Sequence, residues 1–334
     1  MPVLGAAILL AALCFIKPPD GSPADVPIHR SDFLLNTFVD IAIYDSRDES
    51  ILDGAMALCR EYENRFSRTL SGSEVYRLNH REDATGTYPL SDDMTDLLAT
   101  ALYYCERSGG AFDITTEPLS SLWNFSGTSP SVPPAEAIEE ARKKVDYKKL
   151  RLDGTRSTLT FLDPGTSIDL GAIAKGYIAD QLKAYLLDSG VESAMINLGG
   201  NVLCVGSRPD GTPFTVGLQK PFADRNETFA QVEVSDLSVV ASGVYERHFV
   251  EDGKNYHHIL DPSTGYPYDN GLISVTILSE RSVDGDALST TCFSLGLSRG
   301  MELVESMDGV YACFIDEDYQ IHYSDGMEKF LRKD

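Results

Sequence analysis

Two adjacent histidines lie in the segment best suited to acid–base chemistry, residues 256–267 (Tyr-His-His-Ile-Leu-Asp-Pro-Ser-Thr-Gly-Tyr-Pro). They open a short apolar run that ends in a turn, where Pro262 fixes φ and Gly265 can adopt a positive φ without strain. Successive side chains of a strand point to opposite faces, so only one of the two histidines can face a given cleft. We take His258 as a candidate general base. The alternative is an ordinary strand end that carries a surface histidine.

A second candidate segment, residues 166–177, combines small residues with a single lysine. The pattern predicts a strand that ends and a helix that begins near Gly171 and runs to about Asp188. A helix N-terminus offers free N–H groups to a phosphate, and Lys175 adds a positive charge. This is not a Walker motif, because Lys175 precedes Gly176 and no Ser or Thr follows in the required place. The alternative is a helix whose small residues only pack closely against a sheet.

The third candidate segment, residues 283–291, opens a predicted helix and supplies oxygen ligands. Asp286 and Thr290 are separated by one helical turn, so they lie on the same face of that helix. A carboxylate and a hydroxyl are hard oxygen ligands of the kind that Mg²⁺ accepts. Acidic residues are also common in the first turn of helices, so the alternative is a helix cap with a polar surface residue.

The charge of the chain limits the ligands that these segments could bind. The formal net charge is −23, with 51 Asp and Glu residues against 28 Lys and Arg residues. Nucleic-acid binding needs clustered basic residues, so the sequence argues against a nucleic-acid partner. An anionic ligand would need a local cation, and a bound metal ion would supply one.

The N-terminus carries an apolar stretch from Pro2 to Ile16, followed by Lys17. This is shorter than the ~20 residues that span a bilayer, so we expect residues 1–17 to be a signal peptide or an N-terminal membrane anchor. Residues 10–14 are similar to a lipoprotein box ending at Cys14, although Leu13 stands where a small residue is usual. Residues 18–31 are predicted to be a linker. Residues 32–334 are then one folded domain outside the cytoplasm, anchored to the membrane or secreted.

Hydrophobic periodicity predicts an α+β fold rather than a doubly wound nucleotide-binding fold. Strands are expected at residues 37–44, 193–197, 202–206, 214–218, 229–234, 238–242, 273–278, 310–315 and 320–323. Helices are expected at residues 49–65, 92–107, 135–144 and 171–188. A hairpin is expected at residues 149–161. Because long helices interrupt the strands without alternating regularly, we expect mixed and antiparallel sheets with flanking helices.

Six segments of the sequence occur in a familiar order. They are residues 110–115 (Gly-Ala-Phe-Asp-Ile-Thr), 168–177, 197–201 (Asn-Leu-Gly-Gly-Asn), 242–247 (Ser-Gly-Val-Tyr-Glu-Arg), 258–267 and 286–290 (Asp-Ala-Leu-Ser-Thr). Together they resemble the ApbE family, the FAD:protein FMN transferases, over nearly all of the chain from about Asp32 onward. The resemblance implies a single catalytic domain, related to the T-fold, that holds a flavin in a cleft.

The resemblance also implies a reaction. Enzymes of this family bind FAD and Mg²⁺, cleave the pyrophosphate and attach FMN through a phosphoester to a Thr or Ser of an acceptor protein, releasing AMP. The implied partner is a protein with a Thr/Ser flavinylation motif, such as the FMN-binding domain of a redox pump or flavoprotein.

Site residues follow from the resemblance position by position. Mg²⁺ would be bound by the main-chain carbonyl of Ala172, the carboxylate of Asp286 and the hydroxyl of Thr290. His258 would take the proton of the acceptor hydroxyl. The implied FAD contacts are Leu35, Ala111, Phe112, Asp113, Asp169, Lys175 and Leu260. At residues 35–37 this chain has Leu-Asn-Thr where the family often has Met-Gly-Thr.

Two other functions stay open at the level of sequence. With water in place of the acceptor hydroxyl, the same residues would make an FAD pyrophosphatase that yields FMN and AMP. A periplasmic flavin-binding lipoprotein without enzymatic activity would bind FAD and leave it intact. Asp286, Thr290 and His258 favour an enzyme, because binding alone needs no base.

Overall fold

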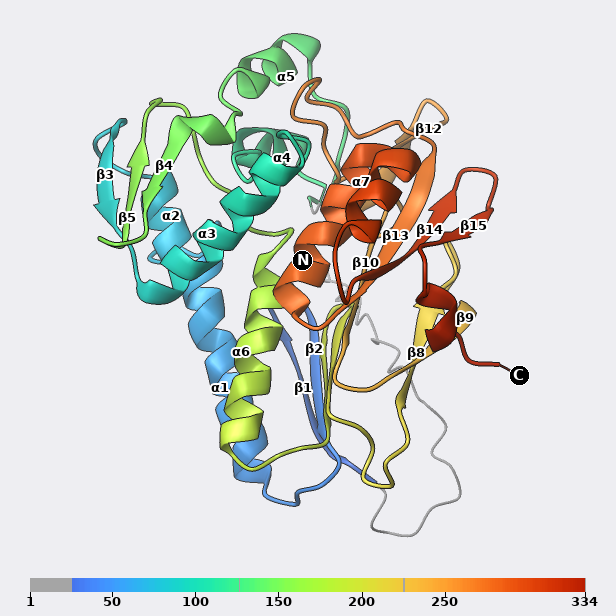
Figure 1. Cartoon of the computed structure of the whole chain (residues 1–334). Coiled ribbons are helices and arrows are strands. Elements are labelled where there is room, and N and C mark those ends of the chain that lie inside the picture. The colour runs from blue at the N-terminus through green and yellow to red at the C-terminus, as the bar shows by residue number, and fades with distance from the viewer. Residues whose placement is uncertain (1–25, 126, 225, 334) are drawn as a thin grey trace, which may run out of the picture.

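An eight-stranded sheet runs through the centre of the computed structural model, which describes residues 26–125, 127–224 and 226–333 (Figure 1). Its strands follow the order β1-β2-β6-β7-β10-β13-β14-β15, and every pairing is antiparallel. The strands are β1 Ile28–Leu34, β2 Thr37–Ile43, β6 Ala194–Leu198, β7 Asn201–Val205, β10 Ser238–Gly243, β13 Leu272–Ser279, β14 Tyr311–Asp316 and β15 Ile321–Tyr323. The predicted α+β class is confirmed, with antiparallel pairing throughout the described sheets.

Both faces of the central sheet are covered, which explains the apolar sequences of its middle strands. All five residues of β7 are buried. Leu203 and Val205 belong to the main core, whereas Val202 and Cys204 belong to a second core. Alternate side chains point to opposite faces, so β7 contributes to both cores. The second core lies between the sheet and the hairpin of β8 (Phe214–Gln219) and β9 (Thr228–Val234), and it includes Met327 of a 3₁₀ helix, Met327–Phe330.

Three helices cover the other face of the sheet: α1 Glu49–Phe66, α6 Ala174–Asp188 and α7 Ser282–Glu305. In Figure 1, α1 and α6 lie side by side in front of β1 and β2, and α7 lies in front of β10 and β13. The buried residues of α1 recur at helical spacing, as predicted: Leu52, Ala55, Met56, Cys59, Tyr62 and Phe66. α6 and α7 also pack against each other, and this contact positions the candidate site.

The remaining elements lie above the N-terminal end of α6 in the view of Figure 1. The helices are α2 Glu74–Asn79, α3 Asp92–Arg107, α4 Glu117–Trp123, α5 Ala135–Arg142 and a 3₁₀ helix, Tyr147–Lys149. A three-stranded sheet has the order β3 (Gly86–Pro89), β5 (Thr158–Phe161) and β4 (Leu150–Asp153). A separate hairpin joins β11 (His248–Glu251) to β12 (Lys254–His257), and it leads directly into the histidine segment.

Two boundaries differ from the prediction. β1 begins at Ile28, inside the stretch expected to be a linker, and it pairs with β2 along its whole length. The sequence of β1 mixes polar and apolar residues, as edge strands often do, so hydrophobic periodicity did not indicate a strand there. α6 begins at Ala174 rather than near Gly171, because Asp169 accepts the Gly171 N–H and holds a turn before the helix. Residues 1–17 lie outside the described residues, and no helix within the described part is long and apolar enough to cross a membrane.

Gly176 lies where α6 approaches the start of α7 most closely. A Cβ atom at this position would be 2.3 Å from the backbone oxygen of Ser282 and 2.7 Å from Cα of Val283. Backbone atoms cannot move aside as a flexible side chain can, so the close approach of the two helices requires glycine here.

Gly176→Ala should lower the free energy of unfolding by about 1–3 kcal/mol, the usual cost of overpacking, although alanine is the better helix former. Denaturant unfolding measures this change. Gly154→Ala is the matched control, because nothing lies within 4 Å of a Cβ there, and its stability should change by less than about 0.5 kcal/mol. Equal stabilities of the two variants would contradict the close packing.

Candidate active site

Helices α6 and α7 each supply a carboxylate that accepts hydrogen bonds from backbone N–H groups at the start of the other helix. Asp180 of α6 accepts the backbone N–H groups of Ser282 and Val283 at 2.8 and 2.9 Å. Asp286 of α7 accepts the N–H of Gly176 at 2.9 Å in return. Free N–H groups at a helix start favour negative charge, so each helix stabilises the start of the other. These bonds hold Asp286 against the segment 166–177.

The carboxylate of Asp286 is also paired with Lys175. The lysine Nζ lies 3.1 Å from Oδ1 and 3.4 Å from Oδ2. The side chain of Asp286 is 5% exposed, whereas that of Lys175 is 28% exposed. A buried carboxylate without partners would be costly, and the lysine and the Gly176 N–H satisfy this one. Two predicted site residues from distant parts of the sequence are therefore in direct contact.

Thr290 follows Asp286 by one turn of α7 and takes part in a group of hydroxyls. Ser242 Oγ, at the end of β10, lies 3.1 Å from Thr290 Oγ1 and 2.8 Å from Ser289 Oγ. Ser289 donates to the carbonyl of Asp286 at 2.9 Å. These bonds attach the first turns of α7 to the central sheet, so Asp286 and Thr290 are held on one rigid surface.

Asp169 organises the turn that carries Ala172. Its Oδ1 accepts the N–H of Gly171 at 2.9 Å, and its Oδ2 lies 3.3 Å from Nε of Arg68. The N–H of Asp169 donates to the carbonyl of Ile114 at 2.8 Å, which joins the segment 110–115 to the segment 168–177. Ala172 is partly buried in this turn, just before α6 begins.

The implied flavin contacts in the segment 110–115 differ in their exposure. Phe112 is buried in the main core. Asp113 is also buried and accepts the N–H groups of Thr115 and Tyr147 at 2.7 and 2.8 Å. Burial raises the pKa of Asp113, although these hydrogen bonds act in the opposite direction. Ala111 is only partly buried. The side chain of Phe112 is thus packed in the core, and the carboxylate of Asp113 is occupied by hydrogen bonds within the protein.

The two histidines face different surroundings, as strand geometry predicts. His257 is buried beside the ring of Phe293, with 5.8 Å between ring centroids, and its Nε2 lies 2.9 Å from the carbonyl of Tyr268. His258 is partly buried, and its backbone N–H donates to the carbonyl of Arg247 at 3.1 Å. Burial, followed by the charges of Arg247, His257 and Lys175, lowers the pKa of His258 to about 3. His258 is therefore neutral at physiological pH, and it becomes an effective base only where a bound anion raises this pKa.

Trp123 anchors the turn that follows the histidines. Its Nε1–H donates to the carbonyl of Gly265 at 2.8 Å. Gly265 has a φ of 77°, and a Cβ there would lie 2.6 Å from a methyl group of Ile138, so glycine is required. The same small core buries Leu260, whose side chain packs away from solvent. The other aromatic rings packed on the indole are Phe125, Phe249, Tyr256 and Tyr266.

The structure thus brings Lys175 against Asp286, with Thr290 one turn further along α7, and the charge of Lys175 also acts on His258. The Ala172 turn leads into this cluster. Leu35 is different. It has a φ of 56° in the turn between β1 and β2, and its N–H donates to the carboxylate of Glu63 at 2.8 Å. In the described structure, no hydrogen bond of Leu35 joins it to this cluster.

The residues of the cluster fit a magnesium ion that shares its ligands with a substrate. No group of three or more His, Cys, Asp or Glu side chains within the described part of the chain could hold a metal by itself. Mg²⁺ is commonly bound through one or two carboxylates, with substrate phosphates and water completing its shell. Asp286 supplies one buried carboxylate, and Thr290 supplies a hydroxyl on the same helical face. These donors suit such an ion.

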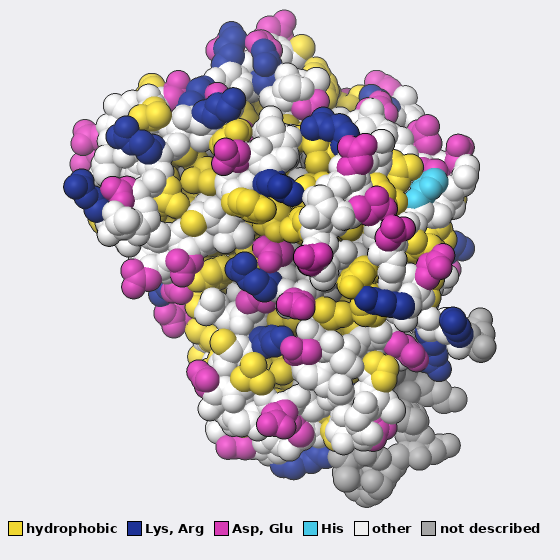
Figure 2. Space-filling model, viewed as in Figure 1, with side chains coloured by type: hydrophobic (Ala, Val, Ile, Leu, Met, Phe, Trp, Pro, Cys, Tyr) yellow, Lys and Arg dark blue, Asp and Glu magenta, His cyan; other side chains and the backbone are white. Residues whose placement is uncertain are grey.

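Cations and carboxylates are paired at the cluster, as they are on the surface. On the face shown in Figure 2, Lys and Arg side chains are interspersed with Asp and Glu. Near the cluster, Arg68 lies against Asp169 and Lys175 lies against Asp286, while the charge of Arg247 acts on His258. An anion that binds beside Lys175 would therefore compete with the carboxylate of Asp286 for its ammonium.

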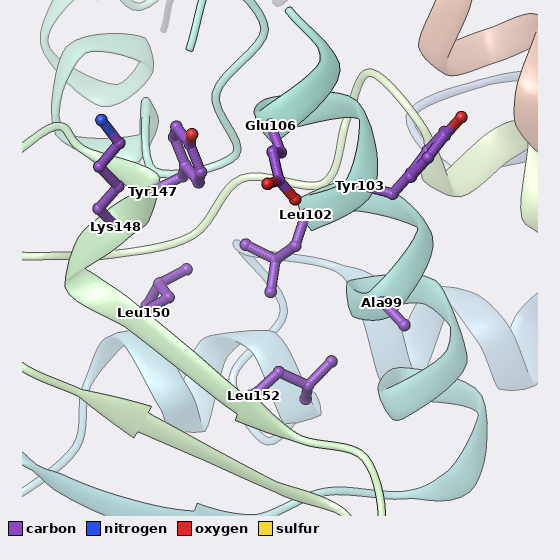
Figure 3. Close-up of a pocket in the computed structure, with 8 residues that line it drawn as sticks. All are labelled: Ala99, Leu102, Tyr103, Glu106, Tyr147, Lys148, Leu150 and Leu152. Carbon is purple, nitrogen blue, oxygen red and sulfur yellow. The ribbon is translucent and has the colours of Figure 1, made fainter. Parts of the chain in front are cut away.

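A cavity of about 380 Å³ lies elsewhere, between α3 and β4. Figure 3 shows Leu102 and Glu106 of α3 facing Tyr147, Lys148 and Leu150 across it. None of the predicted site residues lines this cavity. It is therefore separate from the cluster around Asp286.

Comparison with known proteins identifies the family. The model of the ApbE family matches residues 35–315. The chain belongs to the ApbE family. An FAD:protein FMN transferase of Klebsiella pneumoniae (strain 342) is 38% identical over 278 residues, which cover 83% of this chain and 85% of that protein. An FAD:protein FMN transferase of Treponema pallidum (strain Nichols) is 32% identical over 344 residues, which cover 97% of this chain and 94% of that protein.

Solved ApbE structures share the fold. The ApbE protein of Thermotoga maritima superposes with a TM-score of 0.83 at 32% identity, covering 92% of this chain and all (100%) of that one. The flavin transferase ApbE of Vibrio cholerae has a TM-score of 0.82 at 27% identity, with 91% and 99% covered. The ApbE fold predicted from the sequence is confirmed.

Four residues of this ApbE site were not singled out by sequence reasoning: Arg68, Asp180, Ser242 and Arg247. Ser242 and Arg247 lie in the segment 242–247, which contributes to the family resemblance, but the sequence assigns no function to either residue. Asp180 lies one helical turn after Gly176, but its partners are backbone groups of a distant helix. Such a pairing leaves no pattern in the local sequence.

Asp180→Ala should lower the free energy of unfolding by about 0.5–2 kcal/mol, the range for a lost helix cap. Burial raises the pKa of Asp180 to about 6, so its charge is costly. Asp180→Asn removes this charge and keeps an oxygen acceptor for one N–H, so it should lose less stability than Asp180→Ala. Denaturant unfolding at neutral pH compares the two variants. Wild-type stability of Asp180→Ala would show that the cap is not needed.

Proposed function

We propose that this chain transfers FMN from FAD to a Thr or Ser hydroxyl of an acceptor protein and releases AMP, with Mg²⁺ as cofactor. The observation that carries the proposal is the buried carboxylate of Asp286, in contact with Lys175, whose charge also acts on a neutral His258. A phosphoryl transfer needs this combination, because it depends on positioning, on neutralising charge and on a base for the nucleophile. The named activity of the relatives supports the same reaction.

Each residue of the cluster has a role in this proposal. Asp286, Thr290 and the carbonyl of Ala172 would hold Mg²⁺, which when bound neutralises charge on the diphosphate. Lys175 would bind an oxygen of the same diphosphate. His258 would accept the proton of the acceptor hydroxyl, an effect typically worth ~10²–10⁴ in rate. Because the hydroxyl is a poor nucleophile, the neutral state of His258 is the one that the reaction requires.

The transferase reaction can be separated from FAD hydrolysis by following the acceptor. Incubation with FAD, Mg²⁺ and a purified acceptor domain should give a covalent FMN adduct by mass spectrometry, whereas a pyrophosphatase would give free FMN and an unmodified acceptor. Asp286→Ala should lower adduct formation by about 10²–10³-fold or more, as expected when charge stabilisation is removed. Asp284→Ala is the matched control on α7, because its carboxylate faces the hydroxyl of Tyr104. FMN release without any adduct would overturn the proposal.

The pH dependence tests the base. His258 is neutral in the free protein down to about pH 3, so the acid limb of kcat/KM should lie below about pH 4 rather than near 6.5. Bound FAD brings negative charge that offsets Lys175 and Arg247, so the pKa of His258 should rise in the complex. The acid limb of kcat should therefore lie at higher pH than that of kcat/KM. His258→Gln should lower the rate of transfer by about 10²–10⁴-fold, and an unchanged rate and pH profile in that variant would exclude His258 as the base.

The location of the protein is part of the proposal. The apolar stretch Pro2 to Ile16 supports export, with residues 1–17 as a signal peptide or anchor and the domain outside the cytoplasm. The acceptor would then be an extracytoplasmic protein with a Thr/Ser flavinylation motif. Fractionation of cells expressing the full chain tests this, and recovery in the cytoplasm would contradict it.

A further inference from the structure

Lys175 does not point at an open anion site. Its ammonium lies against both oxygens of Asp286, at 3.1 and 3.4 Å, and within the described structure it makes no other hydrogen bond or ion pair. The role proposed above asks the same lysine to bind a phosphate of FAD, and it asks the same carboxylate to bind Mg²⁺. The proposed function therefore asks the carboxylate that already holds Lys175 to hold a metal ion as well.

We propose that Lys175 and a divalent cation compete for Asp286, and that FAD relieves the competition by giving the lysine a new anion. This inference rests on the proposed function and adds a coupling between its two ligands. Like charges repel at short distance, more strongly where the dielectric constant is low, so the ion and the ammonium weaken each other's binding to the carboxylate.

The surroundings of the pair allow such an exchange. The carboxylate stays in place, because the Gly176 N–H binds its Oδ2 at 2.9 Å and does not depend on the lysine. The ammonium is at the end of a flexible stem and is 28% exposed, so it can turn toward a diphosphate. Within the described structure, no carboxylate other than Asp286 forms a hydrogen bond or ion pair with Lys175. An anion brought by the substrate would supply a second partner.

The consequence is positive cooperativity between the ion and FAD. A ligand that frees Asp286 strengthens ion binding, and by thermodynamic linkage the ion strengthens FAD binding by the same factor. Lys175 thus acts as a positioning residue that favours binding of the ion together with the nucleotide.

Mn²⁺ binding to the full chain without turnover tests the proposal, measured by calorimetry or by electron paramagnetic resonance. Without FAD, Lys175→Met should bind Mn²⁺ about tenfold more tightly than the wild type, and the strengthening of Mn²⁺ binding by FAD should shrink by a similar factor. Lys175→Arg keeps the charge and should bind Mn²⁺ as weakly as the wild type. Lys183→Met is the matched control, because this lysine of α6 pairs with Asp236 at 2.8 Å and its loss changes the net charge equally.

The sign of the change decides between roles of the lysine. Unchanged Mn²⁺ affinity in a folded Lys175→Met, checked by thermal unfolding, would mean that the lysine serves the phosphate alone. Weaker affinity would mean that it only orders the carboxylate, and either result overturns the competition. If Asp286→Asn removes Mn²⁺ binding while Lys175→Met behaves in one of these ways, the proposed function stands without the coupling. Wild-type Mn²⁺ affinity in Asp286→Asn would overturn both, because the ion site would lie elsewhere.

Discussion

The mutual capping of α6 and α7 is the constraint on which the site depends. Asp180 of α6 accepts hydrogen bonds from the free N–H groups at the start of α7. Asp286 of α7 accepts one from a free N–H group at the start of α6. Gly176 makes this possible, because any side chain there would collide with the backbone at Ser282. Buried carboxylates are normally costly, and here backbone N–H groups and one lysine stabilise them. In the proposed reaction, the metal ligand is therefore a carboxylate that the fold already needs.

A second constraint concerns charge. The chain carries a net charge of −23, yet the charges of Lys175 and Arg247 both act on a neutral His258. In a low-dielectric cleft, such cations act on an anionic ligand more strongly than charges at the surface do. The same cations disfavour a charged imidazole. In the proposed reaction, the same cations would act on both the substrate and the base.

The sequence predicted those parts of the site that depend on local patterns. The helix spacing placed Asp286 and Thr290 on one face of α7, and strand alternation correctly required His257 and His258 to face different surroundings. The antiparallel sheet and the covering helices also followed from periodicity. The contact between Asp286 and Lys175 could not be predicted in this way, because it joins helices separated by a large part of the chain.

The parts that were missed have physical reasons. β1 lies at the edge of the sheet, where polar side chains are tolerated, so its sequence did not alternate clearly enough to show a strand. Asp180 and Ser242 act through backbone groups and hydroxyls of α7, and only the tertiary structure reveals these partners. Phe112 and Leu260 are apolar residues in the core, and the resemblance that named them as flavin contacts does not distinguish side chain from backbone.

Trp123 gives this arrangement a practical consequence. It is the single tryptophan of the chain, and its indole holds the carbonyl of Gly265 in the turn that follows His258. Any displacement of that turn would change the surroundings of the only indole, so the emission of the unmodified protein reports on the histidine segment. Flavins absorb in the range where tryptophan emits. The protein thus contains its own optical probe for arrival of the nucleotide, with no label to be introduced.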